Sequence, residues 1–101
     1  MPQENVPYTE YALSMARCYY MVSQPERGDE IVSSLLRRSD EWLSWINTIK
    51  SSRRAGSLYN HYTWMQTMEQ ALVVAEQFER TEFIHQYIKQ YEHYIKQFQQ
   101  N

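Results

Sequence analysis

Three histidines, His61, His85 and His93, are the side chains of this 101-residue chain best suited to metal binding or acid–base catalysis. A zinc site of the HExxH type needs two histidines on adjacent turns of a helix. His85 and His93 are eight residues apart on one predicted helix, and neither Glu82 nor Glu92 completes a recognised ligand set with His85. We therefore expect structural histidines, no metal and no cofactor.

The other residue types used in catalysis also lack a catalytic arrangement. Cys18, the single cysteine, lies beside the apolar face of a predicted helix, where we expect a small buried thiol. The sequence has no glycine-rich phosphate loop and no GxSxG, CxxC or calcium-loop pattern. The carboxylate pairs Asp29-Glu30 and Asp40-Glu41 are placed near predicted helix starts, where negative charge favours the helix dipole. We expect no catalytic residues and no enzyme.

A basic cluster, Lys50, Arg53 and Arg54, follows Arg37 and Arg38 and could contact phosphates or an acidic partner. The alternative is a solvated helix end whose cations complement the negative end of the helix dipole. The net charge is −2 and the ten basic residues are spread along the chain, so overall charge does not favour nucleic-acid binding.

Aromatic side chains make up 15% of the chain, more than one face of each helix can bury. Trp45 and Trp64 fall near the edges of the apolar stripes, so they are candidates for a surface groove that binds a peptide or a neighbouring subunit. Tyr87, Tyr91 and Tyr94 form an edge of the last predicted helix and are further candidates for this partner surface.

These residues must be positioned by helices, because only two Gly and three Pro occur and no segment alternates as a strand does. Apolar residues recur three or four positions apart, which predicts an all-α domain over residues 1–101. The expected helices cover about 8–22, 24–51, 57–79 and 81–99 and form two consecutive antiparallel hairpins. A break at Ser39-Asp40 is the alternative to one continuous second helix.

The candidate N-terminal caps near the expected helix starts are Thr9 or a neighbour after Pro7, Ser23 with Glu26 three residues on, Ser57, and Thr81. The last helix contains the near-repeat YIKQYEHYIKQF, whose spacing resembles a coiled-coil seam. Ile88 and Ile95 widen this seam, and two heptads are fewer than a coiled coil normally uses. We therefore expect the segment to close the domain, with self-association of the helical bundle as the alternative.

Ala16 and Gly28 are small residues twelve positions apart across the first expected turn. Since Gly in a helix costs roughly 1 kcal/mol relative to Ala, close packing of the two helices at this pair is expected. The spacing, with the segment Met15-Ala16-Arg17-Cys18-Tyr19-Tyr20, resembles the tetratricopeptide repeat (TPR) over about residues 9–40. Ala12 or Leu13 stands where that family has Trp, so the likeness is to a degenerate, TPR-like hairpin.

This hairpin is followed by the segment EWLSWINTI, a basic loop and a closing hairpin that ends in a Tyr-rich helix. The same order is similar to the soluble C-terminal region of a Bacteroidetes family of multi-pass membrane proteins. The membrane part of that family resembles protein O-mannosyltransferases. The resemblance implies an accessory domain excised from a longer chain and tethered to a membrane through flanking sequence, with any sugar-transfer chemistry elsewhere.

The sequence predicts no direct membrane insertion by this segment, because it has no long apolar run and no signal peptide. We expect a non-catalytic helical scaffold that binds a protein, a peptide or another part of a larger parent chain. The alternatives are a nucleic-acid-linked regulator that uses the surface from Arg37 to Arg54, and a homo-oligomer.

Overall fold

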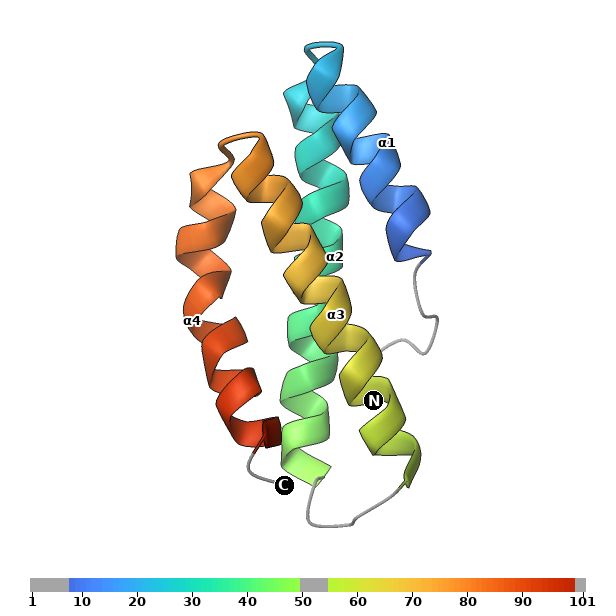
Figure 1. The fold of residues 1–101 in the computed structure, drawn as a ribbon, viewed down its shortest axis with the longest axis vertical. Coiled ribbons are helices and arrows are strands. Elements are labelled where there is room, and N and C mark those ends of the chain that lie inside the picture. Colours follow the sequence, from blue (N-terminus) through green and yellow to red (C-terminus); the bar gives the residue numbers. More distant parts are fainter. Residues whose placement is uncertain (1–7, 50–54, 100–101) are drawn as a thin grey trace.

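The computed structural model describes residues 8–49 and 55–99 and contains four α-helices (Figure 1). They are α1 (Thr9–Met21), α2 (Pro25–Ile49), α3 (Ala55–Gln77) and α4 (Thr81–Gln99). No strand occurs within these residues, so the all-α prediction is confirmed. The expected end of the second helix at residue 51 lies outside the described residues. Because α3 already begins at Ala55, Ser57 lies inside the helix and the prediction that it is the cap is wrong.

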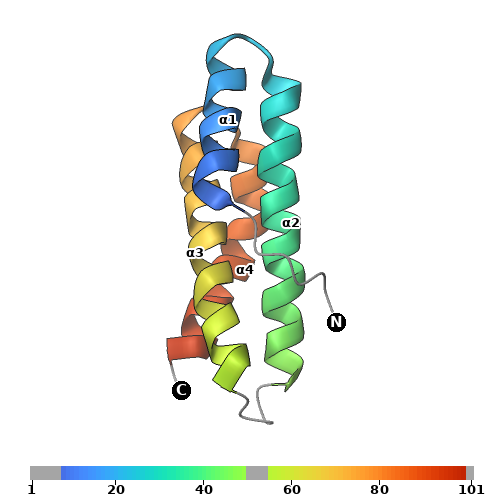
Figure 2. The ribbon, with the colours of Figure 1, turned by 90° about the vertical axis from the view of Figure 1, so that its right-hand side faces the viewer.

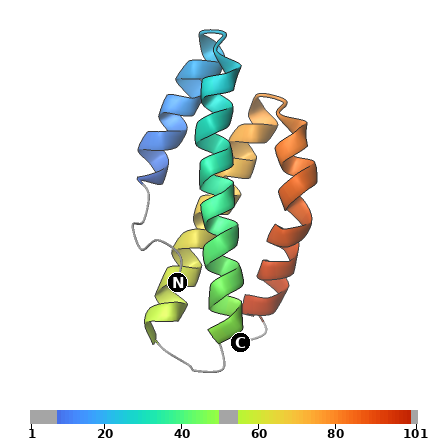
Figure 3. The same cartoon turned by 180° about the vertical axis from the view of Figure 1, so that it is seen from behind.

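The helices form two antiparallel hairpins, α1–α2 and α3–α4, as the sequence predicts (Figure 1). The long helices α2 and α3 lie side by side at the centre, and Figure 2 and Figure 3 show α1 and α4 on opposite sides of this pair. The two short turns lie at the same end of the molecule. This order brings α1 next to α3, although 33 residues separate the end of one from the start of the other.

Helix α2 runs through Ser39-Asp40 without a break, so the prediction of one continuous second helix is confirmed. The Ser39 side chain is fully buried, and its hydroxyl donates a hydrogen bond of 2.7 Å to the Leu35 carbonyl in the preceding turn. This bond satisfies the polar group within the helix, so a serine in the core does not interrupt it.

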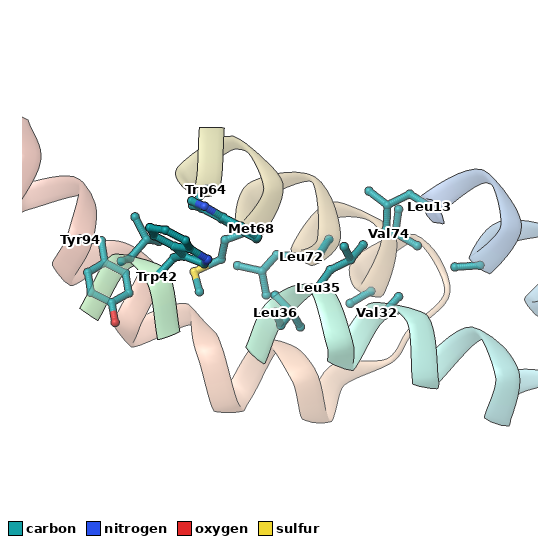
Figure 4. Packing of buried hydrophobic residues seen from close by; sticks show 14 of the residues in the cluster. Leu13, Val32, Leu35, Leu36, Trp42, Trp64, Met68, Leu72, Val74 and Tyr94 are labelled. Carbon is teal, nitrogen blue, oxygen red and sulfur yellow. The ribbon is translucent and has the colours of Figure 1, made fainter. Parts of the chain in front are cut away.

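The core has an aliphatic part near the two turns and an aromatic part toward the other end of the helices (Figure 4). Leu13, Val32 and Val74 bring α1, α2 and α3 together in the aliphatic part. In the aromatic part, Trp42 and Trp64 stack with their ring centres 5.9 Å apart. Large rings fill the space between α2 and α3 that α1, which is only 13 residues long, does not reach.

Both short turns have the Schellman geometry, in which a residue with positive φ ends the helix and two backbone N–H groups bond back to its last turn. In the first turn Ser23 has φ 64°, and the Gln24 N–H donates to the Tyr19 carbonyl at 2.8 Å. In the second turn Glu79 has φ 58°, and the Arg80 N–H donates to the Ala75 carbonyl at 2.8 Å.

The predictions that Ser23 and Thr81 are N-terminal caps are therefore wrong. Ser23 ends α1 rather than starting α2, and Thr81 is already the first residue of α4. For α1 the cap position is Tyr8, the neighbour after Pro7 that is the alternative to Thr9, and it makes no side-chain capping bond.

Candidate functional site: the groove between α1 and α3

The aromatic residues predicted to line a partner surface are mostly part of the core. Trp64 has an exposed fraction of 0% and Tyr94 of 5%, so the prediction that they lie on the surface is wrong for both. Trp45, Tyr87 and Tyr91 are half-buried against the core. Trp64 is covered because it stacks on Trp42. This contact depends on the position of the neighbouring helix, so the place of Trp64 at the edge of an apolar stripe does not predict it.

Tyr94 is buried with its hydroxyl paired. It donates a hydrogen bond of 2.6 Å to the Asp40 carboxylate, which connects α4 to α2. Burial, and then the hydrogen bond to Asp40, raise the pKa of the Tyr94 phenol above its ordinary value. The Tyr edge of α4 therefore holds the two hairpins together at this position.

The small residues Ala16 and Gly28 are both buried, as expected for close packing. At Gly28 the neighbour is the ring of Tyr20, because an added Cβ would lie 2.6 Å from two of the ring carbons. The close approach thus joins Gly28 to a large side chain, whereas the sequence suggested a pair of small ones.

Tyr20 belongs to a polar cluster that sequence reasoning missed, which also contains Asp29, Phe78 and Arg80. The Tyr20 hydroxyl donates to Asp29 at 2.7 Å, and the Arg80 guanidinium binds both oxygens of the same carboxylate. The Tyr20 ring stacks on Phe78 at 5.0 Å. Burial, and then the bond to Asp29, raise the pKa of Tyr20, while the Asp29 hydrogen bond raises that of Arg80. The cluster joins the two turns.

The candidates for metal binding and catalysis remain separate. His85 and His93 are exposed, and across residues 8–49 and 55–99 no group of three His, Cys, Asp or Glu side chains could hold a metal ion. Cys18 is exposed, so the prediction of a buried thiol is wrong. Cys18 lies beside the apolar face of α1, so its thiol is not packed against α2 or α3.

The basic cluster Lys50, Arg53 and Arg54 lies outside the described residues. Upstream, Arg37 is exposed, whereas the Arg38 guanidinium lies 5.6 Å from the centre of the Trp64 ring. A cation over an indole face is stabilised by the ring quadrupole. Arg38 thus helps to cover the aromatic core.

A hollow lies between α1 and α3. Two adjoining pockets of about 410 Å³ each share Glu10 and Gln70 and together make one open groove. Its lining consists of Tyr8, Thr9, Glu10, Tyr11, Leu13, Ser14 and Arg17 from the first hairpin and Thr63, Gln66, Thr67, Glu69, Gln70 and Val73 from α3.

Two hydrogen bonds join the walls of this groove. The Thr9 and Thr67 hydroxyls are 3.0 Å apart, and the Arg17 Nε donates to the Gln77 side-chain carbonyl at 3.3 Å. The second bond is the nearer of the two to the turns. These bonds hold α1 and α3 in register, so the groove has a defined width.

The groove presents polar groups together with apolar surface. Tyr8, Tyr11 and Val73 are exposed by 87%, 70% and 46%, so they offer apolar surface to a ligand. The amides of Gln66 and Gln70 can both donate and accept hydrogen bonds. Sequence reasoning missed the groove because it needs α1 beside α3, which no local pattern indicates.

Comparison of the chain with protein-family models, with curated proteins and with solved structures finds no match. Within residues 8–49 and 55–99, no helix is both long enough and apolar enough to cross a membrane. The groove geometry is therefore the main guide to function.

Proposed function

We propose that this protein is a non-catalytic helical scaffold that binds an extended segment of another protein in the groove between α1 and α3. The observation that supports this most directly is the combination, in one open groove, of exposed apolar side chains with side-chain amides. An extended peptide carries unpaired backbone N–H and C=O groups, and the amides of Gln66 and Gln70 match both kinds of group.

The length of the groove sets the length of the bound segment. From Thr63 to Val73 the wall on α3 rises by ten residue steps, or roughly 15 Å at the rise of an α-helix. An extended chain covers this distance with about five residues. The exposed side chains of Tyr11 and Val73 supply apolar contacts, and Glu10, Glu69 and Arg17 place charges of both signs beside them.

The proposal agrees with the TPR-like resemblance, for which we expect a peptide to bind in the concave face of the hairpins. It is also compatible with an accessory role in a longer membrane protein, in which case the bound segment could belong to the parent chain. Reading the genomic frame on both sides of this chain tests that part, since the parent protein requires membrane-spanning segments upstream.

Selection from a random eight-residue peptide library tests peptide binding by the protein itself. We expect enriched peptides whose affinity falls at least tenfold in Val73→Glu and in Gln70→Ala, because each change removes one of the two kinds of contact. Lys89→Ala, on the exposed face of α4, is the matched control and should bind as the unchanged protein does. Enriched peptides that bind all three variants equally, or no enrichment at all, would contradict the proposal.

A further inference from the structure

The outer face of α1 carries a row of exposed, largely apolar side chains, which we call the α1 stripe: Tyr8, Tyr11, Met15, Cys18 and Val22. The exposed fractions are 87% for Tyr8, 70% for Tyr11, 37% for Met15 and 61% for Val22, and Cys18 is also exposed. The spacing places Tyr11, Met15 and Cys18 on one side of the helix, and the cap residues Tyr8 and Val22 extend the row at its two ends. Leu13 and Ala16, on the other side, pack into the core.

The opposite flank of the molecule has a different character. All exposed positions of α4 whose side chains the structure describes are polar or charged: Thr81, Glu82, His85, Gln86, Lys89, Glu92, His93 and Lys96. An exposed apolar row on one flank only is typical of an interaction surface, because single apolar residues are normally scattered.

The area of the α1 stripe suits a small interface between two proteins. A tyrosine side chain contributes roughly 200 Å² when fully accessible, so Tyr8 and Tyr11 together expose about 300 Å². With Met15, Cys18 and Val22 the stripe reaches on the order of 500 Å². Two such stripes would bury about 1,000 Å² in total, which is the lower limit for a specific interface.

The arrangement of the stripe favours a second copy of the same chain as its occupant. Tyr8 and Val22 lie seven residues to either side of Met15, and Tyr11 and Cys18 lie four and three residues from it. A two-fold axis at Met15 therefore sets the aromatic half of one stripe against the smaller side chains of the other. No stripe residue carries a formal charge, so like charges do not oppose each other across this axis.

We propose that two copies of this protein associate through their α1 stripes, antiparallel about Met15, as a symmetric dimer. Its weak affinity follows from the small buried area. Tyr8 and Tyr11 belong both to the stripe and to the groove between α1 and α3, so the dimer and the bound peptide would share these two side chains. Met15, Cys18 and Val22 do not line the groove, and changes at Met15 therefore test the dimer separately from peptide binding.

Sedimentation velocity over a range from micromolar to millimolar protein tests the dimer. The unchanged protein should shift from monomer to dimer, and Met15→Glu should raise the dissociation constant more than tenfold, since two carboxylates would meet at the axis. Because Met15 is partly exposed, circular dichroism should show Met15→Glu folded as a monomer. Gln86→Glu at an exposed position of α4 changes the charge by the same single unit, so it is the charge-matched control and should dimerise normally. A protein that stays monomeric throughout, or a Met15→Glu dimer of undiminished affinity, would overturn the proposal.

Cysteine crosslinking tests the position of the axis. In a Cys18→Ser background, Met15→Cys should form an intermolecular disulfide under mild oxidation, because the two thiols would face each other. Ser14→Cys is the matched control, since Ser14 is exposed on the neighbouring position but points away from the stripe. Equal crosslinking of the two variants would show that the stripe is not the interface, and would favour a partner of another kind on α1.

Discussion

The Tyr20 side chain is held from four directions. Its hydroxyl donates to Asp29, its ring stacks on Phe78, the Arg80 guanidinium lies 5.6 Å from the ring centre, and the ring edge fills the space above Gly28. A ring with this many contacts cannot turn aside without breaking one of them. The glycine at position 28 is therefore required by the shape of the Tyr20 site.

Gly28→Ala should lower the free energy of unfolding by about 1–2 kcal/mol. The added Cβ would lie 2.6 Å from the Tyr20 ring, and relieving this overlap costs more than the roughly 1 kcal/mol that Ala gains over Gly in a helix. Chemical denaturation measures the change, with Glu30→Ala at an exposed position of the same helix as the control. Equal or higher stability of Gly28→Ala would show that Tyr20 can move.

At the scale of the elements, the two hairpins use the same turn with different sequences. Each helix ends in a Schellman motif whose positive-φ position is occupied by a residue other than glycine, Ser23 in one and Glu79 in the other. Residues with a Cβ are strained at positive φ. Both turns therefore store a small strain that a glycine would remove.

Ser23→Gly and Glu79→Gly should each stabilise the protein by about 0.5–1 kcal/mol, since the relief of strain exceeds the entropy that glycine adds to the unfolded chain. Thermal unfolding followed by circular dichroism measures the gain. Gln24→Gly, one position beyond the first turn residue and without a positive φ, is the control and should not stabilise. A loss of stability in either glycine variant would mean that the Ser23 or Glu79 side chain makes a contact worth more than the strain.

For the whole molecule, polar contacts cross between the hairpins in addition to the packing of the core. Arg80, in the second turn, binds the Asp29 carboxylate at the start of α2, and Tyr94 in α4 binds Asp40 farther along α2. Both bonds tie the second hairpin to α2, one at each end of the contact. The angle between the hairpins, and with it the groove between α1 and α3, depends on these ties.

A double-mutant cycle of Asp29→Ala and Arg80→Ala should give a coupling free energy of about 1 kcal/mol. The estimate is modest because the two side chains keep exposed fractions of 28% and 35%, and water screens partly exposed ion pairs. The coupling should weaken at high salt. Arg17→Ala with Gln77→Ala, an exposed pair with one neutral partner, is the control and should show a smaller, salt-independent coupling. Full additivity of the Asp29 and Arg80 changes would show that the ion pair does not hold the hairpins.

The sequence was sufficient to predict the helices and hairpins, because apolar spacing and the scarcity of Gly and Pro are local signals. It also located the turns near Ser23 and Thr81. The chemistry of those turns was assigned wrongly, since Ser and Thr are common caps and a Schellman motif without glycine has no distinctive pattern. Local patterns identify an element but not its end.

The groove and the Tyr20 cluster could not be predicted, since each unites residues about 50 or more positions apart. Arg80 and Asp29 are 51 residues apart and Thr9 and Thr67 are 58 apart. Trp64 was misplaced for the same reason, because its burial depends on Trp42 in another helix. Helical spacing indicates which side chains leave a helix together, but only the packing of the helices decides which of them meet.

The stacked indoles of Trp42 and Trp64 also give the molecule a built-in optical probe. The two rings lie 5.9 Å apart at an angle of 11°, one on α2 and the other on α3. At this separation their electronic transitions couple, which produces a circular dichroism signal that a single indole lacks. Trp45 on α2 also lies 5.4 Å from Trp42, so Trp45→Phe is needed to remove this second pair of indoles. In that variant the signal reports the contact between the two central helices, and it distinguishes separation of the hairpins from fraying of α1 or α4 without any added label.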